Sequence, residues 1–140
     1  MNTILLSAAT AWCIAQLAKI SFGLMRHGIS DKPRILWRII WAGGMPSAHS
    51  ALVSSSALVI YLTSGSQSAL FGLSLIAACI VIYDRSRMFA IYRQFQERHP
   101  GLKHAVQRDP LLEDLVGHRF SEILVGILIG LGSGFVTVHL

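Results

Sequence analysis

The charged residues of this 140-residue chain are confined to two windows. All 12 Lys and Arg and all 7 Asp and Glu lie within residues 19–38 and 84–122. Residues 1–18, 39–83 and 123–140 carry no charged side chain and consist largely of apolar residues. A soluble domain of this size buries only about 60–70% of the surface of its unfolded chain, so it could not hide so much apolar sequence. The distribution therefore predicts an integral membrane protein.

The composition argues against other classes of protein. Charged residues make up 14% of the chain, against about 25% in a typical soluble domain. The net charge is +5, but the basic residues flank apolar runs, which favours anionic lipid headgroups over nucleic acid as their neighbours. Cys13 and Cys79 give neither a disulfide framework nor a metal-ligand spacing. We expect one membrane-embedded domain over residues 1–140, with no metal, cofactor or nucleic-acid partner.

Four apolar segments are candidates for membrane-spanning helices, which need about 20 mostly apolar residues. Helices are expected because an open sheet cannot satisfy its backbone hydrogen bonds in lipid. The sequence therefore predicts an all-α bundle of about four transmembrane helices, with a polar hairpin at 63–68 between the second and the third. The expected spans are 4–24, 47–63, 69–83 and 121–139.

The two longer connections carry the charge. Residues 35–41 place aromatic and apolar side chains around one arginine, as in an interfacial or re-entrant helix. Residues 84–117 predict a cytosolic loop that is helical in part and broken at Pro100 and Pro110. Loops rich in Lys and Arg stay cytosolic, so both termini should lie on the opposite side of the cytoplasmic or an equivalent inner membrane. The main alternative is an odd number of spans, with the first helix lying in the interface because of Lys19.

Polar residues of all four segments fall at one membrane level. Ionisable residues inside a span are costly and mark functional sites. The residues concerned are Lys19 and Arg26 in the first segment, Ser47 and His49 in the second, Asp84, Arg85 and Arg87 at the end of the third, and His118 and Glu122 in the fourth.

These residue types suit phosphoryl transfer. His118 and Glu122 share a helix face, so the carboxylate can hold one ring nitrogen and leave the other free. Cations neutralise a phosphate, one histidine attacks phosphorus and a second, His49, protonates the leaving oxygen. Taken singly, the residues have ordinary explanations: a capping pair, polar filler at a helix start, and a lysine that extends to the headgroups.

Two segments resemble a known family. Gly43-Gly-Met-Pro-Ser-Ala-His-Ser-Ala51 and Gly117-His-Arg-Phe-Ser-Glu-Ile-Leu-Val-Gly126 resemble the divergent type 2 phosphatidic acid phosphatase family of small membrane proteins. That family is related to the larger type 2 lipid phosphatases and the vanadium haloperoxidases. The resemblance extends over residues 16–130, and the first of the two segments is highly specific.

The superfamily carries the motifs K-x6-R-P, P-S-G-H and S-R-x5-H-x3-D. The chain matches the first with His27 in place of Pro, the second with Ala48 in place of Gly, and the end of the third with Glu122 in place of Asp. The resemblance implies that His118 is the nucleophile that forms a phosphohistidine, Glu122 orients it, His49 is the general acid, and Lys19, Arg26 and Ser47 bind phosphate.

The third motif departs further from the family pattern. Its arginine would fall at Leu112. The divergent family instead has a Tyr-Asp segment followed by arginines, which Tyr83-Asp-Arg-Ser-Arg87 resembles. By this resemblance Arg87 replaces the missing phosphate ligand, with Asp84 and Gly44 as supporting residues. Arg85 and Arg93 are the alternatives for that ligand.

The sequence thus predicts a metal-independent membrane phosphatase that acts on a lipid phosphate monoester or pyrophosphate at the cytosolic interface. Two alternatives remain: a non-catalytic lipid-phosphate binder or transporter, and a small structural membrane subunit. Gly126, Gly130 and Gly134 form a small-residue face that suits close helix packing, within the chain or in a homo-oligomer.

Overall fold

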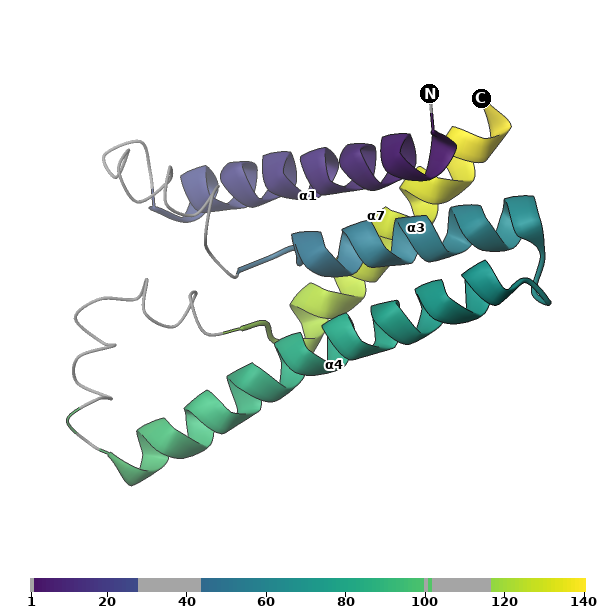
Figure 1. Ribbon diagram of the computed structural model, residues 1–140. Coiled ribbons are helices and arrows are strands. Elements are labelled where there is room, and N and C mark those ends of the chain that lie inside the picture. The colour runs from purple at the N-terminus through teal and green to yellow at the C-terminus, as the bar shows by residue number, and fades with distance from the viewer. Residues whose placement is uncertain (1, 28–43, 100, 102–116) are drawn as a thin grey trace.

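The computed structural model describes residues 2–27, 44–99, 101 and 117–140, without the side chains of residues 24, 26 and 27 (Figure 1). This part of the chain forms four α-helices and no strand, which confirms the predicted all-α class. The helices are α1 (Thr3–His27), α3 (Ala48–Ser64), α4 (Ala69–Arg98) and α7 (Phe120–His139). The helix predicted at 35–41 and the positions of Pro110 and Leu112 lie outside the described residues.

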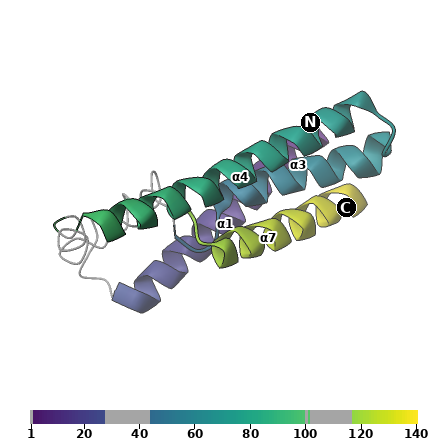
Figure 2. The same cartoon turned by 90° about the horizontal axis from the view of Figure 1, so that it is seen from below.

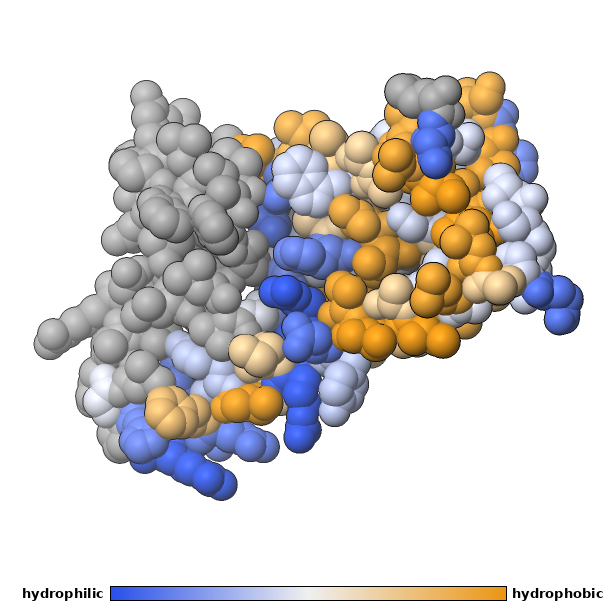
Figure 3. Space-filling view, in the orientation of Figure 1, coloured by the Kyte–Doolittle hydropathy of each residue, from blue (hydrophilic) through white to orange (hydrophobic). Residues whose placement is uncertain are grey.

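Three of the described helices are long and apolar enough to cross a membrane, namely α1, α4 and α7. The fourth, α3, is an apolar helix of 17 residues, at the short end of the lengths that span a bilayer, about 17–25 residues. Leu17, Leu73 and Leu128 each expose more than half of their surface. Figure 3 shows apolar side chains over much of the right-hand part of the face in view. A membrane interior accounts for such exposure, so the protein is an integral membrane protein.

The central helix of the bundle is α3, which packs against α1, α4 and α7, while α7 also contacts α1. Figures 1 and 2 show α3 between α1 and α4, with α7 along one side. Both termini lie at the same end as the hairpin that joins α3 to α4. The first turns of α3 and α7 lie at the opposite end, where the polar residues of the predicted site are found.

Small residues allow α7 to lie directly on α3. A Cβ atom added at Gly126 or Gly130 would overlap the main-chain carbonyl of Ser47 or Ala51, and one at Gly134 would lie 3.0 Å from the carbonyl oxygen of Ser55. The small-residue face is therefore used within the chain and is covered by α3. A homo-oligomer would need a different surface.

Buried hydroxyl groups connect three helices near the middle of the bundle. The hydroxyls of Ser7 in α1 and Ser55 in α3 share a hydrogen bond. Ser133 in α7 donates to the main-chain carbonyl of Ser7 at 3.4 Å. Such bonds satisfy polar groups that have no access to water inside a bilayer.

The helix α4 is longer than the sequence predicted. The third span was expected to end at Tyr83, where the apolar run stops, but the helix continues for 30 residues to Arg98. No Gly or Pro interrupts it after Gly72, and it ends just before Pro100, which restricts the preceding residue. Its charged second half projects beyond the other helices (Figure 1).

Candidate active site

His118 and Glu122 form a hydrogen-bonded pair at the start of α7. The His118 Nδ1 atom lies 3.0 Å from Glu122 Oε2, and the two side chains are only 3% and 14% exposed. The same carboxylate oxygen accepts the main-chain N–H of Arg119 at 3.2 Å, so the helix start also fixes the position of Glu122. In a neutral ring held through Nδ1–H, the unprotonated nitrogen is Nε2. The pair therefore leaves Nε2 for attack on an electrophile.

The main chain of His118 is anchored on α4. Its N–H donates to the carbonyl oxygen of Arg85 at 3.2 Å. The preceding residue, Gly117, has a φ of 141° and lies so close to α4 that a Cβ atom would be 2.8 Å from the Arg85 oxygen and 2.9 Å from the Phe89 nitrogen. Glycine at 117 is thus what allows His118 to approach α4.

The start of α3 is anchored on α7. Ser47 is the N-cap of α3, and its hydroxyl oxygen accepts the N–H and the hydroxyl of Ser50 at 3.4 and 3.0 Å. The Ser47 N–H donates to the main-chain carbonyl of Glu122 at 3.0 Å. The segment before it contains a cis Met45–Pro46 bond, and Gly44 there has a φ of 88°. His49, in the first turn of α3, is held beside the α7 start as a result.

Three basic side chains from three other segments act electrostatically on His49 at this end of the bundle. Lys19, Arg85 and His118 all lie within electrostatic reach of His49. Lys19 is only 6% exposed, whereas His49 is exposed. We call Lys19, His49, Arg85 and His118 the cationic cluster. Figure 3 shows hydrophilic side chains in a band across the same end of the bundle, beside the apolar surface.

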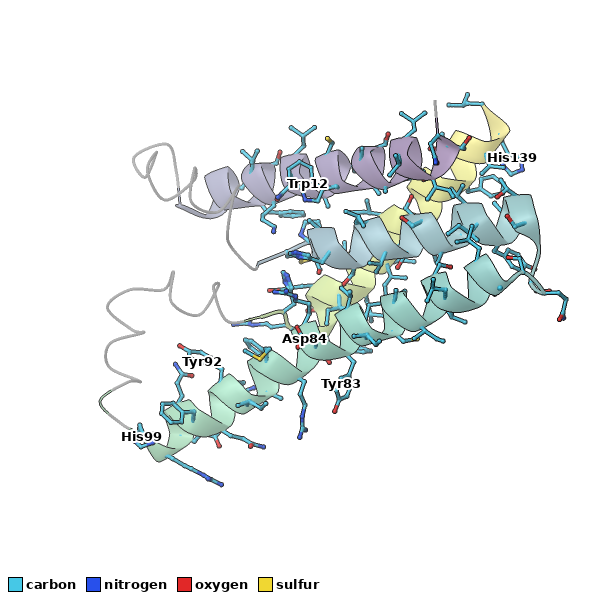
Figure 4. All side chains as sticks on the ribbon, viewed as in Figure 1. Trp12, Tyr83, Asp84, Tyr92, His99 and His139 are labelled. Atoms are coloured by element: carbon cyan, nitrogen blue, oxygen red, sulfur yellow. The ribbon has the colours of Figure 1, made fainter. Side chains whose placement is uncertain are left out.

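Of the other predicted site residues on α4, Asp84 adjoins this cluster, because its Oδ2 lies 3.9 Å from Arg85 Nε. The α4 residues Asp84 and Arg87 are exposed, and Tyr83 points away from the other helices (Figure 4). Two residues along a helix correspond to a turn of about 200°, so Arg87 faces almost opposite to Arg85. Arg26 lies in the last turn of α1, but its side chain is outside the described part.

Two residues at this end of the bundle were incompletely assigned from the sequence. Arg85 was one of three arginines that could complete the phosphate site, with Arg87 and Arg93, because the rotation of α4 that turns Arg85 toward His49 has no signature in one sequence. Gln16 lies one turn before Lys19 in α1 and is only 9% exposed. The sequence signal that could have indicated a role for Gln16 is its amide side chain inside an apolar run.

Among the described residues, no three His, Cys, Asp or Glu side chains lie close enough together to share a metal ion.

Comparison with known proteins identifies the family. No solved structure matches the chain. An uncharacterized membrane protein of Bacillus subtilis (strain 168), YuiD, is 27% identical over 147 residues, which cover 93% of this chain and 90% of YuiD. The model of the divergent PAP2 family, named after type 2 phosphatidic acid phosphatases, matches residues 1–133. The chain therefore belongs to the divergent PAP2 family.

Proposed function

We propose that the protein is a membrane phosphatase that hydrolyses a lipid phosphate monoester or a lipid pyrophosphate through a phosphohistidine. The observation that carries this proposal is the pairing of His118 with Glu122 inside the cationic cluster. One imidazole is oriented by a carboxylate, a second lies nearby, and two cations accompany them. Membership of a family named after lipid phosphatases supports the same reaction class.

In the proposed reaction, Nε2 of His118 attacks phosphorus and forms an N–P bond as the P–O bond to the leaving group breaks. His49 gives its proton to the leaving oxygen. Water then attacks the phosphohistidine and returns its proton to His49, which releases inorganic phosphate and restores Nε2. Glu122 keeps the Nδ1 proton in place throughout and stabilises positive charge on the ring.

Phosphate binding is assigned to the basic residues around the histidines. Lys19 supplies a positive charge from α1, and we propose that Arg26, near the end of that helix, supplies a second. Ser47 is fully buried, and its hydroxyl is used to cap α3, so its contribution would be to hold the chain that carries His49. No step of the proposed reaction requires a metal ion.

A lipid substrate is favoured by apolar side chains beside the cluster. Phe22 and Met25 follow Lys19 on α1, Met45 precedes α3, and all three are exposed. A headgroup held by the cations would leave its acyl or prenyl chain against these side chains and in the bilayer. We place this end of the bundle on the cytosolic side, because Lys and Arg beside spans are retained there.

The test is phosphate release by the purified protein in detergent micelles that contain phosphatidate, phosphatidylglycerol phosphate or a polyprenyl pyrophosphate. We expect release from at least one of them in EDTA, inhibition by orthovanadate, and no turnover by His118→Ala. Full activity of His118→Ala would refute the nucleophile assignment. Saturable binding without release over the whole panel would favour a non-catalytic lipid-phosphate binder.

A further inference from the structure

We propose that Arg85 binds the phosphate of the substrate through its guanidinium group and positions His118 through its main-chain carbonyl. The inference rests on the proposed function, because it names the α4 residue that completes that site. It moves the role expected of Arg87 to a residue on the opposite face of α4.

The Arg85 side chain has unused hydrogen-bonding capacity. Its Nε atom is buried and has no hydrogen-bond partner among the described residues. Within the described part of the chain, the acidic oxygen Asp84 Oδ2 lies 3.9 Å from Nε, which is beyond hydrogen-bond distance. The Nε atom is covered but the side chain as a whole is 40% exposed, so a ligand would approach through the exposed part of the side chain. A buried N–H without an acceptor is destabilising until one is supplied.

The positive charges around His49 favour an anion as the hydrogen-bond acceptor for Arg85. Among the described residues, the side chains that act electrostatically on His49 are Arg85, His118 and Lys19, and none of them is an acid. The carboxylate of Glu122 is already bonded to His118 and to the Arg119 N–H. The planar fork of a guanidinium matches two phosphate oxygens, which a lysine ammonium cannot do.

The main chain links this anion site to the nucleophile. The Arg85 carbonyl accepts the His118 N–H, and Gly117 packs against the same carbonyl. One residue of α4 therefore sets both the position of the bound phosphate and the position of the imidazole. Side-chain substitution at Arg85 leaves this main-chain bond in place, so the two roles can be tested separately.

The experiment compares Arg85→Gln with Arg87→Gln, a matched control that removes the same charge two residues away on the exposed face. Orthovanadate binding is measured by its protection against thermal unfolding, and phosphate release is measured on the same samples. We expect Arg85→Gln to weaken vanadate binding at least tenfold and to raise KM, and Arg87→Gln to stay within about twofold of the wild type. Arg85→Lys, which keeps the charge without the fork, should be intermediate.

Circular dichroism and gel filtration establish whether each variant is folded. If Arg85→Gln is not folded, the comparison is made with Arg85→Lys. Vanadate binding and turnover equal to wild type in Arg85→Gln and Arg85→Lys would overturn the assignment of Arg85 while leaving a phosphatase in place. If the wild type releases no phosphate from any lipid but binds vanadate in an Arg85-dependent way, the phosphatase proposal fails and the anion site stands.

Discussion

At the residue scale, the proposed reaction depends on which nitrogen of His118 is available. Glu122 lies 3.0 Å from Nδ1, and in that proposal the carboxylate has two roles: it selects the tautomer and it compensates the charge that develops on the ring. The same carboxylate also caps the first turn of α7. These roles can be separated, because a glutamine at this position still caps a helix but carries no charge.

Glu122→Gln is therefore expected to remain folded and to lose most of its activity. By analogy with other carboxylate–histidine pairs, kcat should fall by about a hundredfold or more, with a smaller change in KM. Steady-state kinetics of phosphate release measures both parameters. Glu97→Gln, an exposed position on α4, serves as the control. Unchanged kcat in Glu122→Gln would mean that the pair is structural.

The role of His49 predicts a dependence on the leaving group. A general acid matters most when the departing oxygen is strongly basic, as in an alkyl phosphate, and least for an acidic phenol. His49→Ala should lower kcat/KM for a lipid phosphate by about a hundredfold or more and should affect para-nitrophenyl phosphate much less. The decline of wild-type kcat/KM at high pH, where the acid loses its proton, should also disappear. An equal loss on both substrates would contradict the assignment.

At the element scale, the glycines of α7 differ sharply in their surroundings, and only those that face α3 allow the two helices to pack closely. A Cβ atom at Gly130 would overlap the carbonyl of Ala51, whereas one at Gly132, half a turn away on the same helix, meets nothing within 4 Å. Close packing of this kind has no room for even one methyl group, because the obstacle is backbone and cannot rotate away.

Gly130→Ala is expected to lower the free energy of unfolding by about 1–3 kcal/mol, while Gly132→Ala should be neutral or slightly stabilising. Thermal or denaturant unfolding in detergent, followed by circular dichroism, compares the two variants. Equal stability of both would show that α7 does not sit on α3 in the way described. Neither Gly130 nor Gly132 belongs to the cationic cluster. Loss of stability in Gly130→Ala would therefore report a packing defect and not a change in the candidate active site.

Much of the helical architecture was predictable because lipid demands continuous apolar segments. The four expected spans correspond to α1, α3, α4 and α7. Their starts differ from the predicted ones by at most one residue, and their ends by at most three residues except at α4. The end of α4 was missed because hydropathy reports where the membrane ends, whereas a helix ends only where its backbone is interrupted, here near Pro100. The sequence pattern predicted that polar residues of four segments fall at one level, but it could not give the rotation of α4 that turns Arg85 and Arg87 to different faces.

At the scale of the whole molecule, the arrangement predicts a topology. The α3–α4 hairpin and both termini lie at one end, and α4 carries the chain to the other (Figure 1). After the native Cys13 and Cys79 are replaced by alanine, single cysteines at Ser66 and Arg98 should react with a membrane-impermeant maleimide from opposite sides. We expect Arg98→Cys to be labelled from the cytosolic side. Labelling of both from one side would contradict an α4 that crosses the membrane.

Two main-chain hydrogen bonds, from Ser47 to Glu122 and from His118 to Arg85, join α3, α4 and α7 at the site without using a single reactive side chain. Removing the nucleophile should therefore leave the assembly intact, which makes His118→Ala a potential trap for the natural lipid. Mass spectrometry of what co-purifies with this inactive variant, compared with Arg85→Gln, would then name the headgroup and tail directly from cells.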